Sequence, residues 1–581
     1  MIGAAYIAFV GQAPLRRSGR IALAIERLQR DRQLSVLVET PMLLFLGRPS
    51  ARHLVPDRGG SIFWGPLFDR RSSAFDVRPG DSELHAQPAR FLTQFWGSYV
   101  AFRSQEDVVE VFRDPSGAMP CYFTSVDGIH ILTSSPRYLT DQGLVIPSLD
   151  WTIVAQALAF RDLRPASTAL RGISELLPGM RLMIRADKVD PDCIWSPWTF
   201  ASLEREVADF AQAAKSIREA VCQVGASWGR AVARPIVELS GGLDSSIVTA
   251  ALSNAGATPL CATFIPIAGD SDERDYARSV TAHLGLRLAE LELDLAAVDV
   301  TRSDAADLPR PSARAFAQAL DRPLQRLARE HGADMFFSGG GGDHIFCHLQ
   351  SSLPVVDLLR RQGAGRHIAR KAMDVAEVAD ITFWEAIRSA VGRSVERQRL
   401  LPTPRMNQFL AEGARANLPW PSGNPWLAAP EGVLPGKRRH VWALISALNH
   451  LEGFGRQHCA AINSPLLAQP VVEACLRVPT WLWFANGHNR AAAREAFRPL
   501  LPPVVTERRT KAAFDSLGAK VIRDNVPALR DMLCNGLLAR EGLVIPEAIN
   551  RSLTRDIANG EAVADLLAIA DVEAWVRAWV S

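Results

Sequence analysis

The stretch that organises this chain reads Ser240-Gly241-Gly242-Leu243-Asp244-Ser245-Ser246. An apolar, β-branched run at 235–239 comes directly before it, and an alanine-rich run at 247–252 follows. This order predicts a strand, a glycine-rich turn and a helix, an arrangement that aims backbone N–H groups at a phosphate. Glycine lets the backbone approach the anion, the serine hydroxyls add donors, and Asp244 offers an oxygen ligand for Mg²⁺. The stretch lacks the Gly-Lys-Ser/Thr of the Walker pattern.

A second glycine-rich turn follows a second predicted strand. The apolar run 333–337 leads directly into Ser338-Gly339-Gly340-Gly341-Gly342-Asp343. Carboxyl ends of parallel strands meet at one sheet edge, so we expect the two turns to converge and Asp244 and Asp343 to share one Mg²⁺. The alternative, that the second turn is a flexible hinge, stays open. The predicted ATP-binding residues are Leu239, Ser240, Gly241, Gly242, Asp244, Ser245, Ser246, Phe264, Ser338, Gly339, Gly340 and Gly341.

Composition limits the classes of protein that this chain can belong to. It has 581 residues, 48% of them hydrophobic and 22% charged, and a net charge of +3. These values are typical of a soluble protein of several domains and demand no nucleic-acid or membrane partner. No run reaches the roughly 18 apolar residues of a membrane span, and the apolar residues 1–10 are expected to form a buried strand, not a signal peptide. The eight scattered cysteines contain no C-x-x-C pair, which favours the reducing cytoplasm.

The pattern of apolar residues divides the chain into two predicted domains. Residues 1–195 alternate short strand-like runs with turn residues, which predicts an α+β antiparallel sandwich. A linker is expected at 190–198. Residues 203–581 show helical spacing, with short strands expected at 235–239, 260–265, 289–293 and 334–337. This alternation predicts an α/β doubly wound parallel sheet with many helices. The proline-rich segment 400–436 is expected to be a surface loop and a possible lid.

Several motifs carry a resemblance to a known family. They include Arg113-Asp114-Pro115-Ser116-Gly117, Leu177-Pro178-Gly179, both glycine-rich turns, Asn463-Ser464-Pro465-Leu466-Leu467 and Arg508-Arg509-Thr510-Lys511. The chain resembles asparagine synthetase-like enzymes along most of its length. The resemblance implies a degenerate glutaminase-like (Ntn-type) domain at 1–195 and an ATP pyrophosphatase-type synthetase domain at 203–581. It also implies the cofactors ATP and Mg²⁺, and the catalytic residues Lys511, Asp244 and Asp343.

Two departures from the family pattern narrow the expected activity. Glutaminase members expose an N-terminal cysteine, whereas this sequence reads Met1-Ile2-Gly3 and its first cysteine is Cys121, so we expect no glutamine hydrolysis by that mechanism. Asparagine synthetases carry a glutamate where this chain has Gly340, which leaves room for a larger substrate. Both features resemble lasso peptide cyclases, ATP-dependent ligases that release AMP and pyrophosphate. Such an enzyme adenylates an Asp or Glu side chain of a ribosomally made precursor peptide and closes a macrolactam on the peptide's N-terminal amine. The implied partners are that peptide, a leader peptidase and a leader-binding protein.

Other interpretations stay open. The chain could be an asparagine synthetase that uses ammonia or glutamine, a β-lactam synthetase-like ligase, or a nucleotide-binding scaffold without activity. Arg490 and Arg494, four residues apart, could bind phosphate or the substrate carboxylate, or form surface salt bridges with nearby glutamates. His344 and His348 could hold a metal ion or simply flank the second turn.

Overall fold

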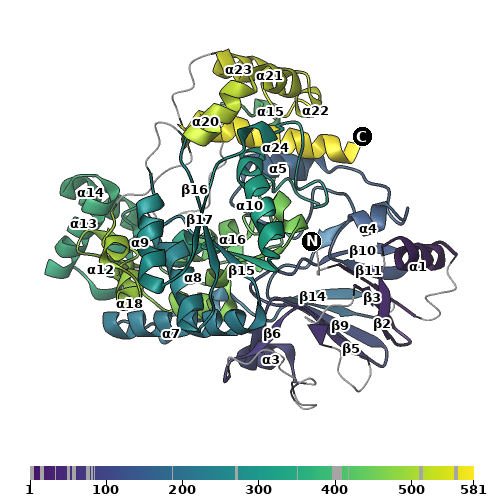
Figure 1. Cartoon of the computed structure of the whole chain (residues 1–581), viewed down its shortest axis with the longest axis horizontal. Helices are drawn as coiled ribbons and strands as arrows, with labels where there is room; N and C mark the ends of the chain where they lie inside the picture. Colours follow the sequence, from purple (N-terminus) through teal and green to yellow (C-terminus); the bar gives the residue numbers. More distant parts are fainter. Residues whose placement is uncertain are drawn as a thin grey trace.

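The structure, a computed structural model, combines two antiparallel sheets in its N-terminal third with a parallel sheet and many helices in the rest (Figure 1). It describes residues 5–12, 19–32, 34–48, 53–54, 60–72, 79, 83, 86–185, 188–267, 272–349, 351–395, 408–416, 418–509, 515–554 and 560–580. The expected succession of antiparallel sheets and a parallel, helix-rich part is confirmed. The exact boundary between the two domains remains a prediction.

The N-terminal sheets stack face to face. The first has the order β12 (Ser174–Glu175), β10 (Tyr122–Val126), β11 (Ile129–Thr133), β1 (Tyr6–Val10), β3 (Leu43–Gly47), β2 (Ser35–Glu39). The second has the order β14 (Val189–Cys193), β13 (Met180–Ile184), β9 (Val108–Arg113), β8 (Val100–Gln105), β5 (Ser61–Trp64), β4 (His53–Leu54). A small ribbon pairs β6 (Leu67–Asp69) with β7 (Phe95–Gly97). Successive side chains of a strand point to opposite faces. Tyr6 and Ala8 of β1 therefore pack between the two sheets, while Ile7 and Phe9 pack against helices on the other side. Both faces of β1 are buried, as the apolar start of the chain predicts.

The prediction of a linker at residues 190–198 is wrong. Residues 190–192 belong to β14, the edge strand, where Pro191 pairs with Leu182. An edge strand has one side without ladder hydrogen bonds, so it accepts a proline that a central strand would not. Trp195 and Trp198 then enter a buried core that also contains side chains of both halves of the chain. The turn-forming residues at this point thus mark an edge strand and not an exposed connection.

The parallel sheet has the order β17 (Leu288–Leu291), β16 (Leu260–Phe264), β15 (Pro235–Glu238), β18 (Met335–Ser338), β19 (Ala461–Asn463). Every neighbouring pair is parallel. The strands that follow β15 in the chain lie first on one side of it (β16, β17) and then on the other (β18, β19). Such sheets bind ligands at the point where the strand order changes direction, and the carboxyl ends of β15 and β18 flank this point. Helices α8 (Leu243–Asn254) and α9 (Arg274–Leu284) contact this sheet, and α10 (Gln318–His331) packs on it through Leu324 and Ala328. Helix α7 (Phe210–Ala231) packs on α8 and contacts α17 (Gln469–Leu476) and α18 (Ala491–Phe497).

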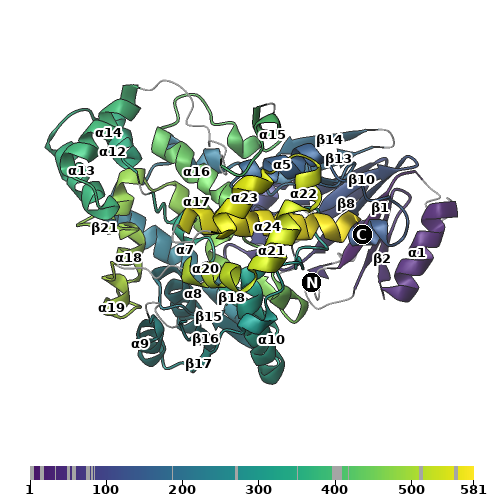
Figure 2. The ribbon, with the colours of Figure 1, turned by 90° about the horizontal axis from the view of Figure 1, so that it is seen from above.

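Two further groups of helices lie at the left and the top of Figure 1. The left group includes α12 (Leu353–Gln362), α13 (Arg366–Ala379) and α14 (Phe383–Val395). The top group includes α20 (Asp515–Asp524), α21 (Val526–Cys534), α22 (Leu537–Arg540), α23 (Pro546–Thr554) and α24 (Gly560–Val580). From above, α24 runs toward the N-terminal sheets (Figure 2), and it contacts α5 (Trp151–Ala159). The other helices are α1 (Gly19–Asp31), α3 (Pro88–Gln94), α4 (Arg137–Thr140), α6 (Pro197–Ala201), α11 (Gly342–Ile345), α15 (Glu412–Ala416), α16 (Pro435–Leu448) and α19 (Pro503–Thr506).

The proline-rich segment 400–436 is only partly a surface loop. Residues 400–407 and 417 lie outside the described residues. Trp426 is buried and packs on Trp195, and the buried Asn424 donates from Nδ2 to the Arg164 carbonyl at 2.9 Å. The second half of the segment is therefore anchored against the N-terminal part.

A buried charge cluster also joins the two parts of the chain. The carboxylate of Glu175 is fully buried and accepts hydrogen bonds from Arg113, Arg164 and Arg310. Arg164 also donates to Glu452 at 2.6 Å, from the N-terminal part into the C-terminal part. Burial by itself would raise the pKa of Glu175, but the guanidinium groups, that of Arg164 first, hold this pKa well below its ordinary value. The cluster thus stays ionised and fixes the two parts together.

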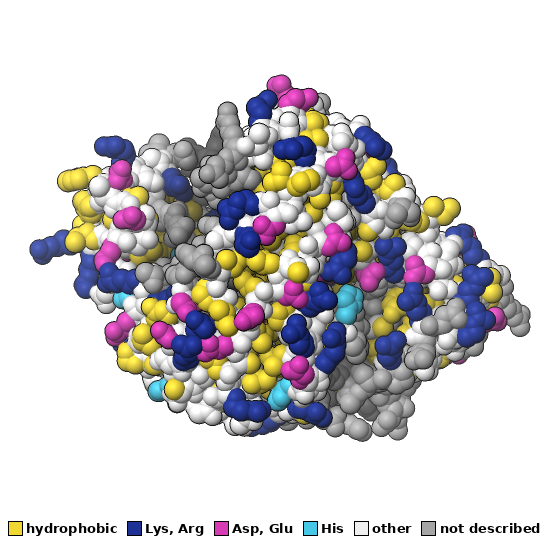
Figure 3. Space-filling view, turned by 45° about the horizontal axis from the view of Figure 1, so that its top comes forward, with side chains coloured by type: hydrophobic (Ala, Val, Ile, Leu, Met, Phe, Trp, Pro, Cys, Tyr) yellow, Lys and Arg dark blue, Asp and Glu magenta, His cyan; other side chains and the backbone are white. Residues whose placement is uncertain are grey.

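The surface mixes charges of both signs. On the face shown in Figure 3, Lys and Arg side chains lie among Asp and Glu side chains. Exposed hydrophobic side chains include Met373 of α13 and Trp384 of α14. Within the described ranges, no helix is both long enough and apolar enough to cross a membrane.

Candidate functional site

Both glycine-rich turns line one cavity at the carboxyl edge of the parallel sheet. Its volume is about 540 Å³, within the range of about 300–1,000 Å³ that ligand pockets occupy. Predicted site residues that line it are Leu239, Ser240, Gly242, Asp244, Ser245, Phe264, Ser338, Gly339, Gly340, Gly341 and Asp343. Gly241 and Ser246 do not line it, and Lys511 lies outside the described residues. The strand, turn and helix order predicted for both stretches is present.

The first turn is built by its glycines and by its own hydroxyls. Gly241 has φ +74°, and a Cβ there would lie 2.5 Å from Cβ of Tyr276, so only glycine fits. Gly242 is the N-cap of α8. The fully buried Ser246 donates from Oγ to the Gly242 carbonyl at 2.7 Å, which stabilises the helix start and takes this hydroxyl away from a ligand. The hydroxyls of Ser240 and Ser245 form a hydrogen bond, with 3.2 Å between their Oγ atoms, and both residues line the cavity.

The second turn lies directly against the first. A Cβ on Gly339 would be 2.5 Å from the backbone N of Ser245, and one on Gly342 would be 2.4 Å from Cγ of Asp244. Real Cβ atoms do not approach so closely, because such distances lie inside van der Waals contact. The absence of side chains at these two positions therefore lets the turns touch and places the carboxylates of Asp244 and Asp343 near each other.

Gly340 differs from its glycine neighbours. A Cβ there would meet only Ser464 Oγ at 3.2 Å and Ser338 Oγ at 3.5 Å. At Gly341, by contrast, φ is +84° and a Cβ would lie 2.6 Å from the Leu467 side chain. The backbone at Gly340 thus faces comparatively open space at the cavity wall, whereas the backbone at Gly341 is closed in.

Arg490 joins the two turns electrostatically. Its Nη1 donates to both carboxylate oxygens of Asp244, at 3.1 Å each, and to Oδ1 of Asp343 at 2.7 Å. Arg490 is the N-cap of α18 and has φ +52°, in the left-handed region that non-glycine residues adopt only when their surroundings enforce it. Such outliers gather at functional sites. The sequence left the role of Arg490 open, and the structure places it between the two predicted carboxylates.

Arg494 adds a second buried guanidinium to the same wall. Its Nε donates to the Asn489 carbonyl at 2.9 Å and its Nη1 to the Thr506 carbonyl at 2.7 Å. Burial, and then the charge of Arg490, lower the pKa of Arg494 to about 10, so it remains a cation at neutral pH. The two guanidinium groups repel each other unless an anion lies between or beside them. Arg490 and Arg494 both line the cavity. The alternative interpretation from the sequence, that they form surface salt bridges with nearby glutamates, is therefore wrong.

The donor set fits Mg²⁺ better than a metal bound by histidine. Among the described residues, no group of three or more His, Cys, Asp and Glu side chains could hold a metal ion. His348 flanks the second turn, with Nδ1 3.3 Å from Asp343 Oδ1. Mg²⁺ is usually bound by one or two carboxylates together with substrate phosphates and water, and Asp244 and Asp343 meet that description.

One side of the cavity is apolar. It follows β16 and β17 and carries Phe264, Ile265, Pro266, Ile267 and Leu293. The glycine-rich turns, the two aspartates and the two arginines lie on the β15 and β18 side. The cavity therefore offers an apolar wall for a planar base and a polar wall for phosphates.

Sequence reasoning missed supporting contacts between segments that are far apart in the chain. Arg456 Nε donates a hydrogen bond of 2.9 Å to Glu238 Oε1 at the end of β15, although the two residues lie 218 positions apart in the sequence. Arg508 pairs with Glu273 and stacks over the ring of Tyr276, 3.9 Å from its centroid. The glycine-rich turns could be found because all their parts are adjacent in sequence, whereas these contacts join distant segments.

Comparisons with known proteins add the following. No curated protein matches the chain. Two solved structures show a weak likeness. One, described as the allosteric regulatory enzyme of purine biosynthesis, is 10% identical over 50% of this chain and 80% of its own, with a TM-score of 0.22. The other is glutamine phosphoribosylpyrophosphate amidotransferase from B. subtilis complexed with ADP and GMP. It is 11% identical over 58% of this chain and 81% of its own, with a TM-score of 0.22. These TM-scores are too low to support a statement about fold or function.

The sequence model of the asparagine synthase family matches residues 230–577, which is more than half of the chain. The matched range contains both glycine-rich turns, Arg490, Arg494 and all strands of the parallel sheet. The chain therefore belongs to the asparagine synthase family.

Proposed function

We propose that this chain is an ATP-dependent ligase that closes a macrolactam ring in a precursor peptide. Enzymes of the asparagine synthase family are ATP-dependent ligases that form AMP and pyrophosphate. The observation that carries the proposal is the contact between the two glycine-rich turns, with Asp244 and Asp343 held on Arg490 beside an apolar wall. This arrangement suits a nucleotide whose phosphates lie on the polar side.

The first step activates a carboxylate. An Asp or Glu side chain of the peptide attacks the α-phosphorus of ATP, an O–P bond forms, the α–β bridging bond breaks, and pyrophosphate leaves. The N–H groups of the turns and the guanidinium groups of Arg490 and Arg494 stabilise the charge that develops on the departing pyrophosphate. Asp244 and Asp343 would hold Mg²⁺, which when bound neutralises phosphate charge. Lys511 is proposed as a further cation for the same charge.

The second step forms the amide. The N-terminal amine of the peptide attacks the acyl carbon, the C–N bond forms, the bond to AMP breaks, and the amine loses one proton. Because amine and acyl group belong to the same peptide, the attack is intramolecular and benefits from a high effective concentration. The enzyme has to align the two groups and exclude water.

Support for a peptide substrate, as opposed to a small amino acid, comes from Gly340. No side chain projects from this position into the cavity, and only two serine hydroxyls lie near it. A glutamate at this position would contact a small substrate; its absence widens the site. The runner-up function is an asparagine synthetase, and a β-lactam synthetase-like ligase is a third candidate.

The proposal extends to partners and location. A leader peptidase would free the N-terminal amine, and a leader-binding protein would deliver the precursor peptide. We place the reaction in the cytoplasm, where ATP is available. All eight cysteines are free, as expected of a protein in a reducing compartment.

Mass spectrometry tests the proposal. The purified chain is incubated with ATP, Mg²⁺ and the leader-free form of a short precursor peptide encoded beside it, with an N-terminal glycine and an Asp or Glu about seven to nine residues on. The ring-closed product is expected to be lighter by one water, with one AMP released per ring. Acetylation of the N-terminus should abolish ring closure, since it removes the nucleophile.

Two parallel reactions separate the alternatives. Aspartate with ammonium, and aspartate with glutamine, are supplied in place of the peptide. Asparagine formation at a good rate, with no dehydrated peptide from the precursor, would assign the chain to asparagine synthetases.

A further inference from the structure

Two smaller cavities adjoin the proposed nucleotide cavity. The second cavity, of about 280 Å³, lies between α5 and α24 and shares the lining residue Arg314 with the nucleotide cavity. The third cavity, of about 200 Å³, shares Asp343 and His344 with the nucleotide cavity. It also shares Asp162 and Leu163 with the second cavity. The space around the second glycine-rich turn is therefore bordered by further space that a substrate can occupy.

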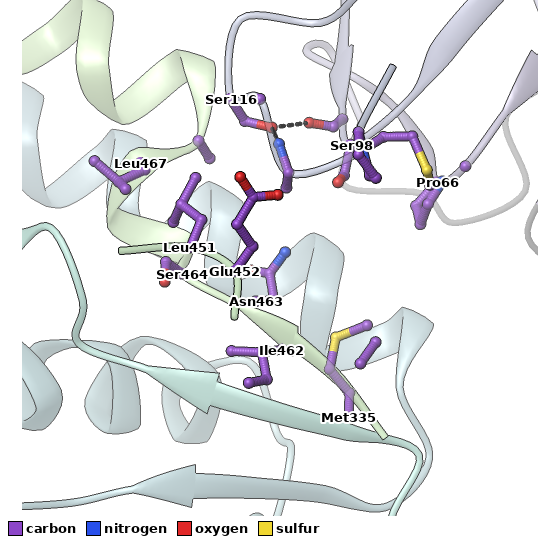
Figure 4. A pocket seen from close by; sticks show the side chains of 18 of the residues that line it. Pro66, Ser98, Ser116, Met335, Leu451, Glu452, Ile462, Asn463, Ser464 and Leu467 are labelled. Carbon is purple, nitrogen blue, oxygen red and sulfur yellow. Dashed lines mark hydrogen bonds between the residues drawn. The ribbon is translucent and has the colours of Figure 1, made fainter. Parts of the chain in front are cut away.

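A larger cavity, of about 430 Å³, lies between the N-terminal sheets and the parallel sheet (Figure 4). Figure 4 shows the Glu452 carboxylate between Ser116 on one side and Asn463 of β19 on the other. Among the described residues, none lines both this cavity and the nucleotide cavity. Leu467, in the wall of the larger cavity, lies against the backbone of Gly341 in the second turn. A substrate that must reach the phosphates is therefore better accommodated by the second cavity.

Arg314, between the two cavities, is a half-buried cation that forms no ion pair with an Asp or Glu of the described residues. Its Nη2 donates to His450 Nε2 at 3.2 Å, and this is its one hydrogen bond within the described part of the chain. A guanidinium can only donate, so His450 accepts on an unprotonated nitrogen and is neutral. Burial lowers the pKa of Arg314, because a charge that leaves water without a partner is costly. The Nε and Nη1 atoms remain available to an anion, since neither is enclosed by the described residues.

The other charges of the second cavity do not compensate Arg314. The charged residues in its wall are Arg161, Asp162, Arg310, Arg314 and Asp571. Arg161 and Arg310 have acidic partners within the protein, at 2.6 and 2.5 Å. Asp162 accepts a hydrogen bond from Ser446 at 3.1 Å. Asp571 accepts the Ala315 N–H at 2.7 Å, and burial raises its pKa to about 7, so only about half of this carboxyl is ionised at neutral pH.

The rest of the second cavity suits part of a larger substrate. Its apolar lining residues include Ile153, Phe160, Leu163, Pro165, Pro311 and Pro421. Its volume is below the range of about 300–1,000 Å³ in which whole ligands usually bind. A substrate that places a few apolar side chains here can therefore extend past Arg314 into the nucleotide cavity.

We propose that Arg314 binds the substrate carboxylate that ATP activates, and that the residues beside this carboxylate in the peptide lie in the second cavity. The inference rests on the proposed function in so far as the substrate is a peptide. The guanidinium donates from Nε and Nη1 to the carboxylate, while Nη2 stays on His450. Held in this way, the carboxylate is positioned for attack on the α-phosphorus. The other available anion is a phosphate of ATP, for which Arg490 and Arg494 already line the cavity.

AMP release tests the role of Arg314 on the full chain. Parent and Arg314→Gln receive ATP, Mg²⁺ and, in separate series, the leader-free peptide or free aspartate. The variant should raise the KM of the carboxylate substrate by about tenfold, because charge-assisted hydrogen bonds are lost, and leave the KM of ATP unchanged. Arg314→Lys keeps the charge without the planar fork and should recover part of the loss. Arg326→Gln, at an exposed position of α10, should match the parent.

The outcomes separate this inference from the proposed function. An unchanged KM of the carboxylate substrate in Arg314→Gln would overturn the role of Arg314. A raised KM of ATP alone would also overturn it and would place a phosphate on this residue. Release of AMP with aspartate but not with the peptide would overturn the macrolactam function, and the aspartate KM would still decide the role of Arg314. Release with neither substrate would overturn both proposals.

Calorimetry locates the peptide. Ala157 of α5 lines the second cavity, and Ala157→Phe fills part of it. With Mg²⁺ and α,β-methylene-ATP, which cannot be cleaved between the α and β phosphates, this variant should bind the peptide about tenfold more weakly, because one apolar side chain loses its place. Ala157→Leu should give a smaller loss, and both variants should bind the ATP analogue as the parent does. Ala211→Phe, at an exposed position of α7, should leave both affinities unchanged. Parent-level peptide affinity in both Ala157 variants, or no peptide binding to the parent, would refute the second cavity as the peptide site.

Discussion

Two buried charge clusters of this molecule are built in opposite ways. In the N-terminal part, one carboxylate, that of Glu175, is surrounded by the guanidinium groups of Arg113, Arg164 and Arg310. In the proposed nucleotide cavity, one guanidinium, that of Arg490, contacts the two carboxylates of Asp244 and Asp343. Glu175 is fully buried, whereas the Asp343 side chain is 30% exposed at the cavity.

We infer from this difference that the first cluster is structural and the second is functional. The Glu175 carboxylate is satisfied by guanidinium groups of the protein and joins its two parts, so it needs no ligand. At Arg490, carboxylates outnumber the one cation that touches both of them, and the cluster borders a cavity that can admit Mg²⁺ and phosphates. We therefore expect changes at Glu175 to affect stability, and changes at Asp244 to affect catalysis.

The largest effect is expected at Glu175. Glu175→Gln removes the carboxylate that the guanidinium groups of Arg113, Arg164 and Arg310 share, and breaking a buried pair in this way costs about 3–5 kcal/mol of unfolding free energy. Denaturant unfolding should show the loss. Asp192→Asn removes an exposed partner of Arg181 and should cost less than about 1 kcal/mol. Equal losses in the two variants would contradict a structural role for Glu175.

Asp244→Asn should leave the fold intact and reduce AMP formation by about a hundredfold to a thousandfold. The change keeps the size of the side chain but removes the charge that Mg²⁺ requires, and losing one preorganised charge interaction in an active site has this magnitude. AMP release in the presence of ATP and peptide is the measurement. Asp275→Asn, at an exposed position on α9, is the matched control. Parent-level AMP release by the Asp244 variant would disprove the shared-metal geometry.

A smaller effect is expected from Arg490→Gln. Charge-assisted hydrogen bonds to carboxylate and phosphate are lost, so ATP affinity, measured by equilibrium binding, should fall by about tenfold. Arg498→Gln, which changes an exposed arginine paired with Glu495 at the end of the same helix, should leave ATP affinity unchanged. An equal loss in both variants would show that Arg490 acts only through the general charge of the helix.

The last expected effect depends on pH and concerns Asp114, a buried carboxylate next to Arg113 that accepts backbone hydrogen bonds from Tyr99 and Ser116. Burial raises the pKa of Asp114 to about 6, so the folded protein holds this proton more tightly than the unfolded chain. Its contribution to stability is complete below about pH 4 and is lost as the pH rises through about 6. The unfolding free energy of the parent minus that of Asp114→Asn should therefore fall by about 2 kcal/mol across this window.

The pH dependence also distinguishes Asp114 from Glu175. The depressed pKa of Glu175 gives a contribution that is present at neutral pH and is lost only on strong acidification. A parent-minus-variant difference for Asp114 that is flat between pH 4 and 6 would mean that this carboxylate is ionised throughout, as Glu175 is.

The parts of the fold that sequence predicts best are those specified locally. The strand, turn and helix around Ser240 and the strand before Ser338 follow from adjacent residues, and the structure has them within one or two positions. β19, three residues long, was missed because so short a run has no periodicity. The linker expected at 190–198 failed because proline and aspartate suit an edge strand as well as a loop.

The candidate site follows the same rule. Both turns were found because each carries its own glycine, serine and aspartate residues. Arg490 was identified only as one of several possibilities, since it lies 246 residues from Asp244 and its contact depends on the whole fold. Lys511 lies outside the described residues, so its role remains a prediction.

The contrast among the four glycines of the second turn has a consequence for engineering new ligases from this scaffold. Libraries that vary positions 339, 341 or 342 should return almost only inactive clones, because any side chain there collides with the first turn or with Leu467. Position 340 is where diversity can be introduced, since a Cβ there meets only two serine hydroxyls at 3.2 and 3.5 Å. When such a library is selected for activity on substrates of a different size, most substitutions in the surviving variants should therefore lie at position 340.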